Sequence, residues 1–160
     1  MLPLTVALRR LDPSGATLTS LHVLFARLCL RGRLFREATI ILDQKIRYFP
    51  STSDKASSNP LHPYACSIHD ISSTYITIKS GLTDKIDYRD HLKYHLHGAI
   101  MYMALKEWEK ALLFLEIVLF TPTNNTASLI QVEAYRKWVL ICLIVDGKVA
   151  KSARFIASID

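Results

Sequence analysis

The sequence is poor in cysteine, with three residues scattered at Cys29, Cys66 and Cys142. An odd number of dispersed cysteines does not make the disulfide framework that holds small secreted domains together. Cys29 and Cys142 lie inside apolar helical segments, where a thiol behaves as a small hydrophobic side chain. The cysteine content therefore favours a reduced, intracellular protein.

The sequence also lacks a hydrophobic run of the roughly 20 residues that a membrane-spanning helix needs. The apolar stretch 111–120 contains Glu116, and the stretch 138–145 is shorter still. No secretory signal peptide is recognisable, because Arg9 and Arg10 follow the first apolar residues instead of preceding them. We expect no membrane partner, and a content of 50% hydrophobic and 21% charged residues predicts a folded domain with a real core.

Signatures of enzymatic sites are missing as well. The sequence has no G-x-x-x-x-G-K-[ST] loop, no G-x-G-x-x-G turn and no G-x-S-x-G nucleophile elbow. The segment "DGKVAKS" lacks the first glycine and the preceding strand of a phosphate-binding loop. We therefore predict no catalytic residues, no cofactor and no small-molecule substrate.

Two histidine groups have the chemistry of metal ligands but not the pattern. His91 and His95 have the i, i+4 spacing of a zinc-protease helix, yet "HLKYH" carries leucine where the general-base glutamate belongs. The "HLH" at 95–97 is not followed by a serine or aspartate ligand at a fitting distance. The second group consists of His62, Cys66 and His69, whose spacings match no structural zinc motif. We predict no metal site.

The chain carries a formal charge of +6, which raises the question of an anionic partner. Its densest basic group lies around an expected turn between helices and consists of Arg27, Arg31, Arg33 and Arg36. No aromatic residues alternate with this group, as they do in RNA-binding sheets. The arginines therefore favour a solvated helix end or a surface for an acidic protein partner, and nucleic acid is the less favoured alternative.

Hydrophobic residues recur at helical spacing over most of the chain. We expect helices at 3–11, 19–32, 33–46, 87–105, 107–120 and 129–147, and the start of another after Gly147. Thr19 or Ser20 is a suitable N-cap for the second helix, and Gly32 can end it in the left-handed conformation. The inward stripe of the helix at 87–105 is expected to hold Tyr88, Leu92, His95 or Leu96, Ala99, Ile100 and Met103.

Two segments do not fit this helical pattern. Residues 51–63, "STSDKASSNPLHP", are rich in serine and proline and read as a loop. Residues 73–79, "STYITIK", hold β-branched residues with a loose two-residue period, so a short extended segment is expected there. We treat the stretch from about 50 to 85 as a mobile loop.

The segment "EWEKALLFLEIVLFTP", 107–122, is apolar almost all the way round. One stripe consists of Trp108, Ala111, Leu112, Leu115, Val118 and Leu119, and the opposite side carries Phe114, Ile117 and Phe120. A helix this short with two apolar faces requires a neighbour on each face. We therefore expect it to pack against its own hairpin partner and against the next hairpin.

An internal repeat supports that arrangement. Aligning "RLFREATIIL" (33–42) with "KEWEKALLFL" (106–115) places Phe35, Ala38 and Leu42 on Trp108, Ala111 and Leu115, at an offset of 73 residues. That offset is about twice the ~34-residue period of tetratricopeptide helix hairpins. The sequence predicts an all-α fold, a tetratricopeptide-like stack of antiparallel helix hairpins (an α-solenoid), as a single helical-repeat domain over residues 1–160.

Three blocks of the chain resemble the third-subunit family of the COP-9 signalosome: 19–43, 94–122 and 133–149. The specific features are Leu28–Leu30, Gly98 with Tyr102, Lys106–Leu112, Thr121–Pro122, Glu133–Lys137 and Gly147–Val149. Members of that family are helical-repeat scaffolds that are capped by a winged-helix PCI module. The chain ends at Asp160 within the expected repeats, so the winged-helix module is expected to be absent.

The resemblance implies a non-catalytic scaffold subunit, present in cytoplasm and nucleus, whose partners are the other signalosome subunits. That complex removes the ubiquitin-like modifier NEDD8 from cullins, and its metalloisopeptidase is a different subunit. Two alternatives stay open. One is another PCI-type subunit, of the proteasome lid or the translation-initiation complex, and the other is a peptide-binding repeat adaptor.

Overall fold

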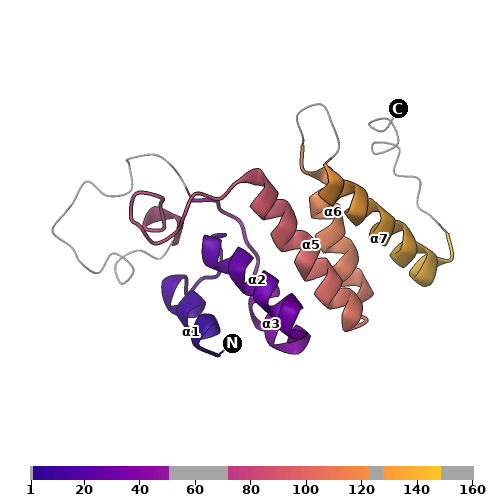
Figure 1. Cartoon of the computed structure of the whole chain (residues 1–160), viewed down its shortest axis with the longest axis horizontal. Helices are drawn as coiled ribbons and strands as arrows, with labels where there is room; N and C mark the ends of the chain where they lie inside the picture. The colour runs from indigo at the N-terminus through magenta and orange to yellow at the C-terminus, as the bar shows by residue number, and fades with distance from the viewer. Residues whose placement is uncertain (1, 51–71, 123–127, 149–160) are drawn as a thin grey trace. The chain divides into compact units, whose positions relative to one another are not determined.

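The computed structural model describes residues 2–50, 72–122 and 128–148, and within them it is helical with no β-strand (Figure 1). The α-helices are α1 (Leu2–Leu11), α2 (Ser20–Gly32), α3 (Phe35–Leu42), α5 (Tyr88–Ala104), α6 (Trp108–Phe120) and α7 (Leu129–Asp146), with a short 3₁₀ turn η2 (Ser72–Thr74). The chain divides into two compact units, Met1–Asp87 and Tyr88–Asp160. The predicted all-α fold is confirmed for the described residues.

In the first unit, α2 and α3 form a helix hairpin beside α1. Helix α2 begins after its N-cap Thr19, one of the two candidates that the sequence indicates. The inner face of the hairpin holds Phe25, Ala26, Cys29, Ala38, Ile41 and Leu42, all almost fully buried. The small side chains Ala26 and Ala38 let the two helices approach closely. Cys29 is a free thiol in this core, and burial raises its pKa to about 11, which keeps it protonated and inert.

Helix α3 is shorter than the expected 33–46, and this boundary prediction is wrong. The helix ends at Leu42, because the chain that follows bonds to the connection between α1 and α2. The amide groups of Arg47 and Tyr48 donate to the carbonyl of Ala16, at 2.7 and 3.0 Å, and the amide of Leu18 donates to Tyr48. Because these bonds require an extended backbone, residues 46–48 cannot continue the helix.

A buried polar network joins that same connection to the segment at 72–75. Asp12 is 2% exposed, and its carboxylate accepts hydrogen bonds from the amides of Gly15 (2.9 Å) and Thr17 (2.8 Å). The Thr17 and Ser72 hydroxyls lie 2.7 Å apart, and Tyr75 donates to the carbonyl of Leu11 at 3.0 Å. The described residues at the end of the expected loop, 72–75, are therefore hydrogen-bonded within the first unit.

The extended segment expected at 73–79 is largely replaced by turns: the 3₁₀ turn η2 occupies its start, Thr77 alone is in a β-bridge, and no named strand follows in the described residues. Thr77 and the residues that follow it form a turn. Thr77 and Ser80 exchange hydrogen bonds, with the Ser80 hydroxyl donating to the Thr77 carbonyl at 2.7 Å. The loop expected at 51–63 lies outside the described residues.

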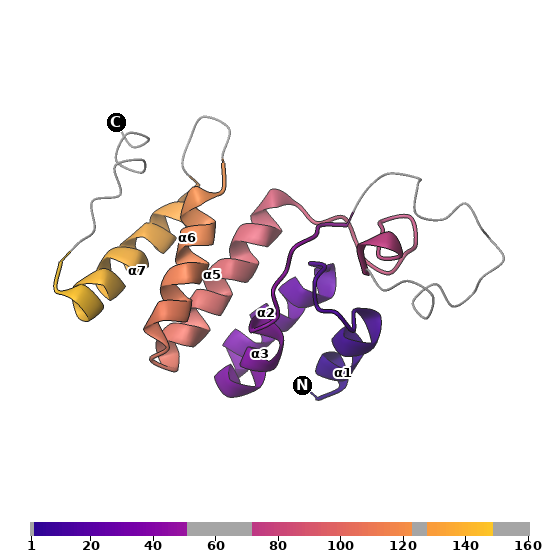
Figure 2. The same ribbon diagram turned by 180° about the vertical axis from the view of Figure 1, so that it is seen from behind.

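In the second unit, α6 lies between α5 and α7 (Figures 1 and 2). On one side the Phe114 ring meets His95 and Tyr102 of α5, with ring centroids 5.4 and 5.1 Å apart. On the other side the Gln131 amide of α7 donates to the carbonyls of Val118 (3.2 Å) and Thr121 (2.9 Å). The prediction that this helix has a neighbour on each apolar face is confirmed.

The expected inward stripe of α5 is only partly right. Leu92, His95, Leu96 and Ala99 are buried, but Tyr88 is exposed, and Ile100 and Met103 are half-buried. Tyr94, Gly98, Met101 and Tyr102 are buried in addition. A single stripe was the wrong pattern for this helix, because α5 is covered over more than one face.

The two hairpin turns share one backbone geometry, and it corrects the prediction for Gly32. That glycine is the last residue of α2, and Arg33 takes the left-handed conformation, with φ of 53°. Lys106, 73 residues later and two residues after the end of α5, also takes this conformation, with φ of 63°. In the first turn, the amides of Arg33 and Leu34 donate to the carbonyls of Leu30 (3.3 Å) and Cys29 (2.9 Å). In the second, at the same offset, the amides of Lys106 and Glu107 donate to the carbonyls of Met103 (3.0 Å) and Tyr102 (3.0 Å). Both are the bond pair of a Schellman motif.

This geometry makes a stability prediction. A non-glycine residue in the left-handed region is disfavoured by its Cβ, so Lys106→Gly and Arg33→Gly should each raise the free energy of unfolding by roughly 0.5–1 kcal/mol. The matched control is Gly147, which has φ of 66°. Gly147→Ala should lower the free energy of unfolding by roughly 1 kcal/mol. Urea unfolding measures both. A loss of stability in Lys106→Gly would show that the interactions of the lysine side chain stabilise the fold by more than its left-handed backbone conformation destabilises it.

Candidate protein-interaction surface

The four predicted arginines lie around the turn of the first hairpin, and all four are exposed. Arg27 and Arg31 are one turn apart on the side of α2 opposite its buried residues. Arg33 is the left-handed C-cap of that helix, and Arg36 lies in the first turn of α3. The hairpin therefore brings together the group that the sequence singles out, and we call these four residues the arginine corner.

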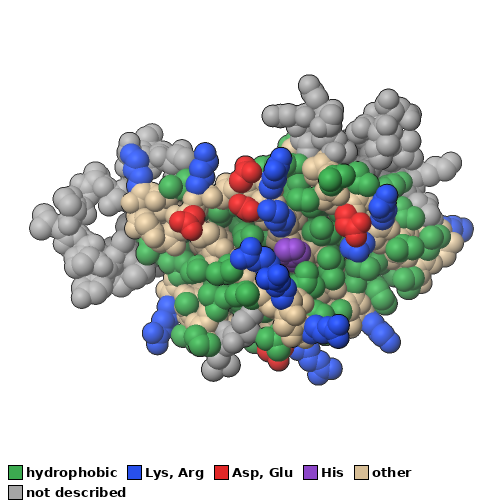
Figure 3. All heavy atoms as spheres, in the orientation of Figure 1, with side chains coloured by type: hydrophobic (Ala, Val, Ile, Leu, Met, Phe, Trp, Pro, Cys, Tyr) green, Lys and Arg blue, Asp and Glu red, His purple; other side chains and the backbone are tan. Residues whose placement is uncertain are grey.

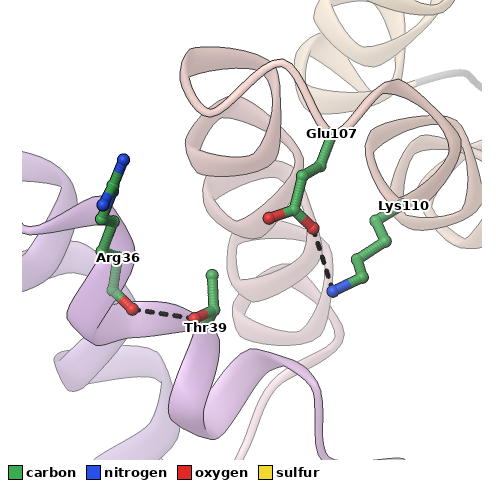
Figure 4. Close-up of polar contacts among 4 residues, drawn as sticks. All are labelled: Arg36, Thr39, Glu107 and Lys110. Carbon is green, nitrogen blue, oxygen red and sulfur yellow. Dashed lines mark hydrogen bonds and ion pairs between the residues drawn. The ribbon is translucent and has the colours of Figure 1, made fainter.

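The four side chains of the arginine corner make no ion pair within the part of the chain that the structure describes. Within the described ranges, the ion pairs belong to lysines, for example Lys110 with Glu107 at 2.9 Å and Lys137 with Glu133 at 2.8 Å, and none involves these four guanidinium groups. Figure 4 shows this difference: Lys110 pairs with Glu107, whereas Arg36 contributes only its backbone carbonyl, which accepts from Thr39 at 2.8 Å. Four unpaired guanidinium groups can bind carboxylates in bidentate fashion.

A second surface feature lies in the other unit. The turn between α5 and α6 and the end of α7 form a shallow groove of about 370 Å³, lined by Lys106, Glu107, Trp108, Glu109, Lys110 and Val145. The sequence predicts Trp108 as interior, but its side chain is half-buried and forms part of this groove. The groove could not be recognised in the sequence, because Val145 reaches it from α7, which is distant from Trp108 in the chain.

Hydrophobic side chains are also exposed on α7, on the side away from the groove. Over α6 and α7 the surface in Figure 3 is largely hydrophobic. On α7 the exposed residues Leu140 (55%), Leu143 (45%) and Ile144 (61%) lie opposite the buried Trp138 and Ile141. No described residue covers this side of the helix, which we call the outer face of α7. Exposed apolar surface of this kind is typical of a site that another helix covers.

The histidines of α5 are packing residues. The rings of His91 and His95 have centroids 4.4 Å apart, and the Nδ1 atom of His95 lies 3.0 Å from the His91 carbonyl. Burial lowers the pKa of His95 to about 4, so the ring is neutral near pH 7. Among residues whose positions are described, no group of three or more His, Cys, Asp or Glu side chains could hold a metal. The candidates His62, Cys66 and His69 lie outside them.

Among the helices of the described ranges, none combines the length and the apolar character that crossing a bilayer requires.

The sequence matches a protein family described as "COP9 signalosome complex subunit 3, N-terminal helical repeats", and the match covers residues 1–159. This family description agrees with the helix hairpins and the repeated turn geometry of the structure.

Individual relatives carry the same name. The chain is 38% identical over 151 residues to "COP9 signalosome complex subunit 3" of Emericella nidulans, covering 94% of this chain and 30% of that protein. It is 30% identical over 145 residues to the Neurospora crassa protein, covering 90% and 28%. The Drosophila melanogaster protein is 41% identical over 64 residues, which are 40% of this chain and 14% of that protein. The chain thus spans under a third of the relatives' length, and it belongs to the family of COP9 signalosome subunit 3 N-terminal helical repeats.

Proposed function

We propose that this chain is a non-catalytic scaffold segment of the COP9 signalosome, working in cytoplasm and nucleus within the complex that removes NEDD8 from cullins. The family match over residues 1–159 carries this proposal. The physical role of the chain is to hold helix hairpins rigid and to present their surfaces to other subunits. No substrate has to enter a cleft for this role.

The structure supports a binding role through what its polar side chains already do. His22 lies against the N-cap of α2, with its Nδ1 atom 3.2 Å from the amide of Thr19. His95 is packed between helices, and Gln131 joins α7 to α6. The two histidines, which could otherwise take part in acid–base chemistry, thus pack within the helices, and the glutamine joins two of them. The exposed features are an arginine corner and apolar helix surface, the combination that protein interfaces use.

Co-purification tests the proposed function. Tagged full chain, expressed in cells of its own organism, should recover the metalloisopeptidase subunit and further signalosome subunits in constant proportion. Recovery of proteasome-lid or initiation-complex subunits instead would contradict the proposal and favour another PCI-type assembly. Binding of short peptides alone, with no signalosome subunit recovered, would favour a repeat adaptor.

We further propose that the arginine corner contacts an acidic protein segment of a partner subunit. The double substitution Arg27→Glu and Arg31→Glu should weaken binding to the recovered partner by about tenfold or more at moderate salt, because like charges are then opposed. Binding by the unmodified chain should fall as salt rises. Fluorescence anisotropy or calorimetry measures the affinity.

The double substitution Lys45→Glu and Arg47→Glu is the matched control, since it changes the net charge by the same amount and both residues are exposed in the same unit outside the arginine corner. It should leave the affinity within about twofold of the unmodified chain. The unfolding free energy of the Arg27→Glu and Arg31→Glu variant should fall by no more than about 1 kcal/mol, since both arginines are exposed and make no ion pair with a described residue, and only Arg31 lies in the last turn of α2. An equal loss of affinity in the control would mean that only net charge matters and would refute a localised surface.

A further inference from the structure

The two hairpin turns share their backbone geometry but carry opposite charges at two corresponding positions. At the offset of 73 residues, Arg36 corresponds to Glu109, and Glu37 corresponds to Lys110. All four residues are exposed and lie in the first turn of the second helix of their hairpin. A partner that places a carboxylate against Arg36 would meet repulsion at Glu109, so the two turns suit partners of different charge.

In the second turn, Lys110 is held by two interactions within its own unit. Its Nζ atom lies 2.9 Å from a carboxylate oxygen of Glu107 (Figure 4) and 5.3 Å from the centre of the Tyr102 ring. Lys106 and Glu109 are exposed, and neither makes an ion pair with any residue whose position is described. One positive and one negative side chain of this turn are therefore available to a partner.

The groove that these residues line also has an apolar part. Trp108 is half-buried there, and Val145 is 46% exposed in the last turn of α7. Four of the six lining residues are charged and the groove is shallow, whereas pockets for small molecules are mostly apolar and enclose their ligand. A partly exposed tryptophan among charged residues is instead the composition of a protein–protein contact.

We propose that this groove binds an amphipathic helix of another protein, with an apolar side chain of that helix against Trp108 and Val145. The helix carries an acidic residue that faces Lys106 and a basic residue that faces Glu109. An extended peptide is less suitable, because it needs a sheet edge for its backbone hydrogen bonds and the groove is lined by helices and their turn. A helix satisfies its own backbone and presents residues three or four apart on one face.

This surface is distinct from the arginine corner, and the proposal does not rest on the role in the signalosome. A stapled, alanine-based helical peptide with Glu, Leu and Lys at positions i, i+4 and i+7 is the probe. The full chain has two tryptophans, and Trp138 is only 6% exposed, so Trp108 reports on the groove. Titration should change the tryptophan fluorescence with a Kd below about 1 mM, and the change should disappear in Trp108→Phe.

Two further peptides separate the apolar contact from the charges. Replacing the leucine of the peptide by alanine should weaken binding by about tenfold, because the apolar contact with the groove is lost. A peptide with Glu, Leu and Glu should bind about threefold or more weakly than the original, because its second glutamate faces Glu109. No fluorescence change up to 1 mM of the original peptide, or equal affinity for all three peptides, would overturn the proposal.

A charge reversal on the protein completes the test. Glu109→Lys should invert the preference, so that the peptide with two glutamates binds more tightly than the original one. Glu116→Lys is the matched control, since it makes the same change of net charge two turns along the same helix and outside the groove. The control should keep the preference of the unmodified chain. An inversion in both variants would mean that only net charge matters and would refute the groove as the binding site.

Discussion

Replacing Leu115 by alanine is expected to lower the free energy of unfolding by about 2–5 kcal/mol, the range for fully buried leucines. Leu115 is 0% exposed in the middle of α6, the helix that packs against both α5 and α7. Removal of its isobutyl group would leave a cavity that helices on two sides cannot close without moving. Urea-induced unfolding followed by circular dichroism would measure the loss.

Leu113→Ala is the matched control, because this leucine lies two residues away on the same helix and is 56% exposed. The same chemical truncation there should cost less than about 0.5 kcal/mol. A loss below half a kcal/mol for Leu115→Ala itself would mean that the interior of the second unit does not lie between these helices. The comparison isolates burial, since helix propensity changes equally in both variants.

The free energy of unfolding should also fall when the pH is lowered from 6.5 to about 4. His22 and His95 are almost fully buried, and desolvation by burial lowers the pKa of each to about 4 from the ordinary value of 6.5. Above pH 6.5 both rings are neutral in the folded and the unfolded chain, and their contribution is constant. Between pH 6.5 and 4 the unfolded chain binds protons that the folded chain does not, so unfolding becomes easier.

Each histidine should contribute roughly 2–3 kcal/mol to this loss when the pH reaches about 4. At His22, the negative charge of Asp12 partly opposes the effect of burial on the pKa. At His95, the hydrogen bond to the His91 carbonyl opposes it in the same way. Below pH 4 both states bind the protons, and these two residues cause no further loss.

Urea unfolding at pH 7.0 and 4.5 would measure the effect in the unmodified chain and in His95→Gln. Glutamine retains a donor for the His91 carbonyl but does not titrate, so this variant should lose a substantial part of the pH dependence. The difference in unfolding free energy between the two pH values can be compared directly between the variant and the unmodified chain, because both proteins have the same carboxylates and these contribute equally. An unchanged pH dependence in the variant would show that His95 is already protonated or accessible in the folded chain.

The helices themselves could be predicted from the sequence, because their hydrophobic residues recur with the helical period. Helices α1, α2, α5, α6 and α7 begin and end within a residue or two of the expected positions. The two-sided hydrophobicity of α6 also indicates its two neighbours, and the offset of 73 residues identifies two hairpins with the same turn bonds. Periodicity and repetition are properties of the chain alone, so both can be recognised before any contact is known.

What the sequence could not decide depends on residues that meet only after folding. Helix α3 ends at Leu42 because residues 47 and 48 bond to Ala16, about thirty residues earlier in the chain. Arg33, not Gly32, takes the left-handed conformation, because the turn bonds to Cys29 and Leu30 determine where α2 ends. The groove at Trp108 likewise requires Val145 from another helix.

By itself, the sequence determined the helical class, the repeat and the family, since local periodicity and aligned motifs are sufficient for these. Only the tertiary structure decided which positively charged side chains lack an ion pair among the described residues, where the helix boundaries fall and which side of α7 no described residue covers. Those features follow from packing between segments that are distant in the chain, and burial and hydrogen bonding there can outweigh local preference.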